Sequence, residues 1–155
     1  MIKSWIITIF VYESRLMTME CNYCANDGRL EKIMIEITKL RVSTVYLFRE
    51  QTYKGRCVVA LNEHHNELFH LTQEAQDAYM RDVAQVASAI EKAFTPGKIN
   101  YGAFGDTMPH VHFHIVPKQK DGPEWGKMFE MNPSGNKQLT EEQYQDLIEQ
   151  IKQHL

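Results

Sequence analysis

The chain lacks the features that mark several large classes of protein. It has no excess of positive charge, because 17 Lys and Arg face 20 Asp and Glu for a formal net charge of −3, and this argues against duplex nucleic acid as a partner. Three cysteines are too few for a disulfide framework and fit a reducing compartment, so a cytoplasmic protein is expected. No internal repeat or low-complexity tract interrupts the sequence.

The first 17 residues contain the apolar run WIITIFVY at positions 5–12. It is too short to span a bilayer and has no small-residue cleavage site, so no membrane partner and no signal peptide are expected. Residues 1–17 are interpreted either as a translated upstream extension or as an added edge strand. Residues 18–155 are expected to form a single domain, because a chain of 155 residues with 43% hydrophobic content is one domain by length.

Hydrophobic patterning predicts five strands and two helices. Runs rich in Ile, Val, Tyr and Phe predict strands over residues 33–40, 44–50, 56–61, 98–104 and 110–117. Apolar residues at helical spacing predict a long helix to Phe94 with Thr72 as its cap, and the capping box TEEQ at 140–143 opens a final helix. This order predicts an α+β fold: an antiparallel sheet of about five strands, one long central helix and a C-terminal helix.

Three histidines alternate with apolar residues in the sequence HVHFHIV at positions 110–116. A period of two places His110, His112 and His114 on one face of a strand. A strand built only for packing would carry Val or Ile there, because a buried imidazole needs hydrogen-bond partners. On these residues alone, the face could be a metal site, a nucleophile with its neighbours, or an unusual polar surface.

A cysteine pair at positions 21 and 24 suits a metal. Cys21 and Cys24 have the two-residue gap that lets two thiolates bind one tetrahedral zinc, although without partner histidines they would be free thiols. Two more nitrogen or sulfur ligands are needed, and His64 and His65 are the only other histidine pair in the middle of the chain. Cys57 lies in an apolar run and is predicted to be a core residue.

The HVHFHIV segment resembles the defining motif of the histidine triad (HIT) family, in which histidine alternates with hydrophobic residues. The similarity includes Lys54-Gly55 before the third strand, His64 near its end, and the sequences INYG at 99–102 and GDTMP at 105–109. It covers about residues 21–118, and the later segment WGKMFEMNP at 125–133 is similar to one shared by a bacterial branch of the family.

The resemblance implies a nucleotide-binding hydrolase or nucleotidyl transferase that forms a homodimer, with a sheet extending across a two-fold axis. Family members with the cysteine pair hold zinc through two cysteines, a histidine after the third strand and the first triad histidine. The matching residues imply one structural zinc per chain, and they are Cys21, Cys24, His64 and His110.

The resemblance also implies roles around a nucleotide. The second triad histidine, here His112, is the nucleophile in the family, and His114 is expected to donate to a non-bridging phosphate oxygen. Asn100 is expected near the ribose and phosphate, and Thr107 can donate a hydroxyl hydrogen bond toward a leaving group. Asp106 departs from the Gln or Asn of many members: its carboxylate would repel a polyphosphate, or would instead read the amine of a phosphoramidate.

Three hypotheses follow from the sequence. The first is an enzyme that attacks the α-phosphate of nucleoside phosphoramidates or dinucleoside polyphosphates through His112. The second is a non-catalytic module on the same fold that senses nucleotide or metal. The third, a zinc hydrolase in which all three triad histidines bind metal, is disfavoured because the cysteines and His64 already complete a four-ligand site with His110.

Overall fold

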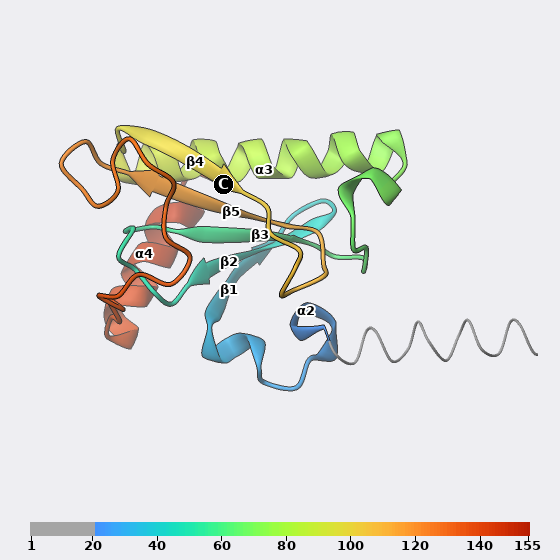
Figure 1. Cartoon of the computed structure of the whole chain (residues 1–155), viewed down its shortest axis with the longest axis horizontal. Helices are drawn as coiled ribbons and strands as arrows, with labels where there is room; N and C mark the ends of the chain where they lie inside the picture. The colour runs from blue at the N-terminus through green and yellow to red at the C-terminus, as the bar shows by residue number, and fades with distance from the viewer. Residues whose placement is uncertain (1–20) are drawn as a thin grey trace, which may run out of the picture.

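A five-stranded antiparallel sheet forms the centre of the protein, seen in a computed structural model that describes residues 21–155 (Figure 1). The expected extension, residues 1–17, lies outside the described residues. The strand order is β1-β2-β3-β5-β4, with every neighbouring pair antiparallel. The strands are β1 (Met34–Lys39), β2 (Ser43–Phe48), β3 (Cys57–Leu61), β4 (Lys98–Gly102) and β5 (His112–Lys118).

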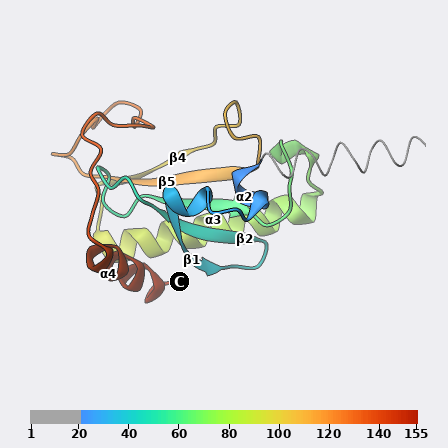
Figure 2. The same cartoon turned by 90° about the horizontal axis from the view of Figure 1, so that it is seen from below.

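Two helices cover one face of this sheet (Figure 2). The long helix α3 (Gln73–Phe94) packs against β5, β3 and β2, and α4 (Glu141–Lys152) packs against α3 and β1. A short helix, α2 (Asn22–Ala25), and two 3₁₀ turns at Leu30–Lys32 and Leu68–His70 complete the described elements. The predicted α+β fold with five antiparallel strands, a long helix and a C-terminal helix is confirmed.

Local signals account for both long helices. The Thr72 hydroxyl accepts a hydrogen bond from the Ala75 N–H and caps α3, and Thr140 and Gln143 form the reciprocal capping box of α4. Each helix buries one apolar stripe in a common core. The buried residues of the stripes include Tyr79, Val83, Val86, Ile90, Tyr144, Leu147, Ile148 and Ile151.

Two predicted strands are wrong at the end nearest the histidines. The strand predicted over residues 110–117 begins at His112. The His110 N–H donates to the Met108 carbonyl and the Val111 N–H donates to the His65 carbonyl, so neither N–H group pairs with β4. The strand predicted over 98–104 ends at Gly102. A Cβ at Gly102 would lie within 2.7 Å of the rings of Phe104 and Phe129, so the absence of a side chain lets both rings pack over this strand end.

The connection between β5 and α4, residues 119–140, has no regular structure but is tied to the sheet along its length. The buried Lys118 ammonium donates to the carbonyls of Glu124 and Lys127, and the Tyr53 hydroxyl accepts from the Glu130 N–H at 2.9 Å. The Glu50 carboxylate accepts from the Lys137 N–H at 3.0 Å. These contacts hold the connection against the end of β5 and against the loop between β2 and β3.

Within residues 21–155, no helix is both long and apolar enough to cross a membrane.

A buried carboxylate fastens α3 to the turn between β1 and β2. Asp82 is 4% exposed and accepts hydrogen bonds from the Val42 N–H at 3.1 Å and the Ser43 hydroxyl at 2.7 Å. We expect Asp82→Ala to lower the free energy of unfolding by about 1–3 kcal/mol, because it leaves two donors unpaired. Urea denaturation measures this change.

The matched control is Asp77→Ala on the same helix, where the carboxylate is exposed and accepts a hydrogen bond from the Gln73 amide at 3.0 Å. Its effect should stay within about 0.5 kcal/mol. Equal losses in the two variants would contradict a specific role for Asp82.

Candidate functional site

Strand β5 presents different chemistry on its two faces. Phe113 and Ile115 face α3, where the Phe113 ring lies 6.1 Å from that of Tyr79. His112 and His114 alternate with them, and their ring centroids are 5.3 Å apart. Both histidines are buried. The histidine face is partly covered by Tyr23 of α2 and by Phe129 of the 119–140 connection.

The predicted metal ligands come together at one point. The donor atoms of Cys21, Cys24, His64 and His110 all lie within 4.8 Å of one another. The Cys21 and Cys24 sulfurs are 3.4 and 3.6 Å from Nδ1 of His110, the Cys24 sulfur is 3.4 Å from Nδ1 of His64, and the two nitrogens are 3.3 Å apart.

These separations match the edges of a zinc coordination tetrahedron. Bonds of about 2.3 Å to sulfur and about 2.0 Å to nitrogen put sulfur about 3.5 Å from nitrogen, and two nitrogens about 3.3 Å apart. Two thiol sulfurs and two imidazole nitrogens are also the donor set that zinc favours. The residues present therefore fit a structural zinc.

His110 meets this cluster with an unprotonated nitrogen. Its Nε2 lies 2.7 Å from the Leu61 carbonyl oxygen, which can only accept, so Nε2 carries the proton and Nδ1 has a free lone pair. Burial lowers the pKa of His110 to about 4, which keeps the ring neutral. A carbonyl that fixes the outer nitrogen is the usual support for a metal-bound histidine.

The cluster selects His64 over its neighbour. His65 is 32% exposed and its Nε2 lies 3.6 Å from the Glu63 carboxylate, away from the cysteines.

Cys57 is fully buried in the core, as predicted, where burial raises the pKa of its thiol.

His112 has the opposite tautomer to His110. Its Nδ1 lies 2.6 Å from the His110 carbonyl oxygen and must donate to it, so Nε2 is unprotonated. Burial lowers the pKa of His112 and favours the neutral ring. The result is an imidazole with a fixed orientation and a lone pair on the nitrogen opposite the strand backbone.

Tyr23 links the cysteine pair to the histidines, and sequence reasoning missed it. Helix α2 carries it between Cys21 and Cys24, and its ring centroid lies 4.9 Å from that of His110 and 5.3 Å from that of His112. Its position inside the Cys-x-x-Cys spacing was the available signal.

A cleft of about 560 Å³ opens over the histidine face. It contains every residue predicted to contact a nucleotide: Asn100, Asp106, Thr107, His112 and His114. The rest of its lining is mostly aromatic or Met, and sequence reasoning did not assign these residues to the site. They include Tyr23, Met34, Phe48, Tyr101, Phe104, Met108, Met128, Phe129 and Met131.

Comparisons with known proteins identify the family of the chain and show its fold in other proteins. The family model of the HIT domain matches residues 36–121. Among solved structures, a histidine triad protein from Sinorhizobium meliloti 1021 is 24% identical with a TM-score of 0.76, over 83% of this chain and 95% of that one. A histidine triad protein from Bradyrhizobium japonicum is 20% identical with a TM-score of 0.75, over 82% and 94%.

A histidine triad protein from Marinobacter aquaeolei VT8 is 18% identical with a TM-score of 0.74, over 84% of this chain and 97% of that one. At these identities the structures show a common fold. A search of curated proteins found no match. Because the family model spans more than half of the sequence and includes all three triad histidines, the chain belongs to the HIT domain family.

Proposed function

We propose that the protein is a nucleotide-binding hydrolase or nucleotidyl transferase that acts on an α-phosphate through a covalent nucleotidyl-His112 intermediate. One observation carries this proposal: the hydrogen bond from Nδ1 of His112 to the His110 carbonyl, at 2.6 Å, leaves Nε2 without a proton in a residue that lines the cleft. A nucleophilic imidazole needs this tautomer, because attack uses the lone pair of the unprotonated nitrogen.

The reaction has two displacements at phosphorus. Nε2 of His112 attacks the α-phosphorus, a P–N bond forms, and the bond to the leaving amine or phosphate breaks with its electron pair passing to the leaving group, which takes a proton from water. Water then attacks the phosphorus, the P–N bond to His112 breaks, and its electron pair returns to Nε2. A nucleoside monophosphate and a proton are released, and two easier steps replace one difficult step.

The other cleft residues are assigned supporting roles. His114 donates to a non-bridging phosphate oxygen, Asn100 contacts ribose and phosphate, and Thr107 donates toward the leaving group. Asp106 lines the same cleft with a negative charge, which favours an amine leaving group over a polyphosphate. Nucleoside phosphoramidates and dinucleoside polyphosphates are the two substrate classes to compare.

A single structural zinc is part of the proposal. Cys21, Cys24, His64 and His110 would hold it, and a closed four-ligand site would fasten α2 to the loops after β3 and before β5. Burial, and then the nearby Cys21 thiol, raise the pKa of Cys24 to about 12, and a bound zinc would favour the thiolate in its place. The site contributes to folding and to the placement of Tyr23, not to the reaction itself.

The zinc proposal predicts different outcomes for Cys24 and Cys57. Protein purified without chelator should contain about one zinc per chain by elemental analysis, and Cys24→Ser should lose it and become less stable, because metal binding is coupled to folding. Cys57→Ala is the matched control, since it also removes a thiol but lies outside the cluster. Zinc retained in Cys24→Ser, or lost in His112→Ala, would contradict the ligand assignment.

A homodimer is proposed through the edge strand β4 and helix α3. Within residues 21–155, β4 pairs only with β5, so its other edge has no partner strand. Tyr101 in β4 and Phe104 just after it are 52% and 46% exposed. Light scattering at micromolar concentration should give twice the chain mass of 18.1 kDa. A mass equal to one chain would refute the dimer.

The nucleophile is tested by His112→Ala. Its rate on adenosine phosphoramidate and on diadenosine tetraphosphate, assayed side by side, should fall on the order of 10³-fold or more, about 4 kcal/mol of barrier. Binding of AMP should survive, because the rest of the cleft is intact. Rapid quenching of the wild-type reaction followed by mass spectrometry should find the nucleotidyl adduct on the peptide that contains His112.

His154→Ala serves as the control, because this exposed histidine belongs neither to the Cys/His cluster nor to the lining of the cleft. Near-normal turnover by His112→Ala, or an adduct on another residue, would overturn the mechanism. AMP binding without turnover of either substrate in the wild-type protein would favour a non-catalytic nucleotide-binding module.

A further inference from the structure

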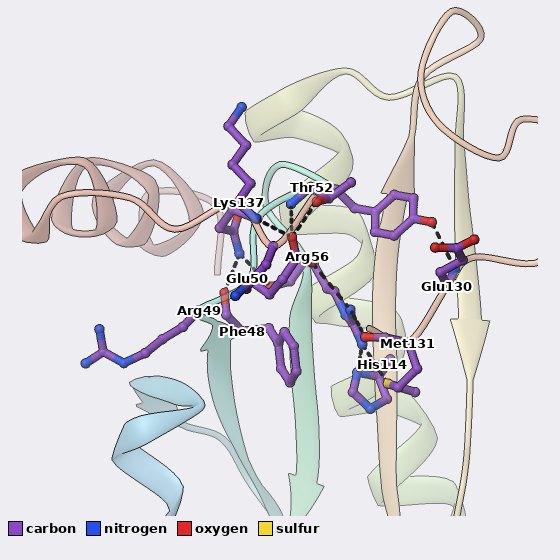
Figure 3. A network of polar contacts seen from close by, with 12 residues as sticks. Phe48, Arg49, Glu50, Thr52, Arg56, His114, Glu130, Met131 and Lys137 are labelled. Carbon is purple, nitrogen blue, oxygen red and sulfur yellow. Dashed lines mark hydrogen bonds and ion pairs between the residues drawn. The ribbon is translucent and has the colours of Figure 1, made fainter. Parts of the chain in front are cut away.

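Arg56 is the largest fully buried side chain among the described residues, and no role has yet been given to it. It lies directly before β3, and its guanidinium extends toward His114 on β5 (Figure 3). A buried charge is costly unless it is paired and hydrogen-bonded. The contacts of the Arg56 guanidinium therefore indicate its role.

The guanidinium makes three polar contacts at its outer end. Nη2 lies 3.2 Å from Nδ1 of His114, and Nη1 donates to the Met131 carbonyl at 3.0 Å. Nη2 also lies 2.8 Å from the Met131 sulfur. The guanidinium stacks on the Phe48 ring, with its central carbon 4.1 Å from the ring centroid. These contacts give the planar group one fixed orientation, with a donor directed at His114.

The charge of Arg56 is only partly compensated. Among residues 21–155 the nearest carboxylate oxygen is Oε2 of Glu50, 3.9 Å away, and neither this oxygen nor Nε of Arg56 has a hydrogen-bond partner there. The other oxygen of Glu50 already accepts from the Thr52 N–H, the Thr52 hydroxyl and the Lys137 N–H. Glu50 is thus held by its own donors at a distance from the guanidinium, and positive potential remains at His114.

This contact determines which nitrogen of His114 carries the proton. A guanidinium has only donors, so Nδ1 of His114 must accept, and the single proton of the neutral ring must lie on Nε2. Burial, and then the positive charge of Arg56, lower the pKa of His114 to about 3, so the ring stays neutral. His114 therefore offers an N–H group on the side of the ring away from Arg56.

The cleft has no cation of its own. None of its lining residues among positions 21–155 is Lys or Arg, and Asp106 adds a negative charge. A phosphate bound there would meet hydrogen-bond donors but no direct positive partner. The Arg56 guanidinium stands one imidazole ring behind the cleft, on the far side of His114.

We infer that Arg56 is a positioning residue: it fixes His114 as the Nε2–H tautomer and supports, with its buried charge, the hydrogen bond from that nitrogen to a substrate phosphate. The second half of this inference rests on the proposed function. The first half concerns the free protein alone. His114 is then a permanent neutral donor, not a group that delivers a proton in the reaction.

The tautomer can be measured without substrate. In protein labelled with ¹⁵N-histidine, the His114 signals are identified by their loss in His114→Ala. Wild-type protein at pH 7 should show His114 with a protonated Nε2 and an unprotonated Nδ1. Arg56→Met should give a mixture of tautomers, and Arg56→Lys should retain the Nε2–H form, because an ammonium group also only donates.

A double-mutant cycle tests whether Arg56 acts through His114. Arg56→Met should lower kcat/KM about 10- to 100-fold, as loss of an orienting partner commonly does, and mainly by raising KM. In the His114→Ala background the same substitution should change kcat/KM by no more than about twofold, because its target is gone. Adenosine phosphoramidate is the substrate for all four proteins.

Tyr53→Phe is the matched control for anchoring of the 119–140 connection. It removes the hydroxyl that accepts from the Glu130 N–H, one residue from Met131, without touching His114. It should leave both the tautomer and KM unchanged. A loss equal to that of Arg56→Met would show that Arg56 only anchors the connection.

The tautomer and kinetic results separate the two proposals. A wild-type His114 with its proton on Nδ1, an unchanged tautomer in Arg56→Met, or equal losses in both backgrounds of the cycle would overturn the role of Arg56. If wild-type protein hydrolyses neither substrate, the proposed function fails, and the wild-type tautomer alone, which requires no variant to fold, decides the role of Arg56.

Discussion

The site depends on what each triad histidine meets with the ring nitrogen that faces the protein. Nε2 of His110 donates to the Leu61 carbonyl, Nδ1 of His112 donates to the His110 carbonyl, and Nδ1 of His114 accepts from Arg56. Three identical side chains on one segment therefore present a lone pair to a metal cluster, a lone pair to a cleft, and an N–H group to the same cleft. Backbone carbonyls and one guanidinium, not the imidazoles themselves, create this difference.

The fold supplies these partners at fixed positions. The antiparallel pairing of β3 with β5 places Leu61 and Arg56, at opposite ends of β3, beside the first and last histidine of the triad. Helix α3 takes up the other face of β5 through Phe113 and Ile115. The 119–140 connection then covers the histidine face and provides Met131 to Arg56. The sheet, helix α3 and the 119–140 connection together fix the orientation of the three imidazole rings.

The fold could be predicted from sequence patterning, and so could the grouping of the candidate metal ligands and cleft residues. Both depend on periodicity and on short motifs. The helix caps at Thr72 and Thr140 and the buried stripes of both helices are where helical spacing predicts them. The start of β5 was misplaced, because the N–H groups of His110 and Val111 donate to the loop carbonyls of Met108 and His65, which no periodicity encodes. Arg56 was missed for a related reason: a charged residue ahead of an apolar strand looks exposed until the 119–140 connection, far along the chain, closes over it.

The three histidines do not all carry their protons on the same ring nitrogen, because they have different partners. Neutron diffraction from a crystal of the protein grown near pH 7 would observe those protons directly. We expect one proton on each ring, at Nε2 of His110, Nδ1 of His112 and Nε2 of His114. A proton on Nε2 of His112, or on Nδ1 of His114, would contradict this expectation.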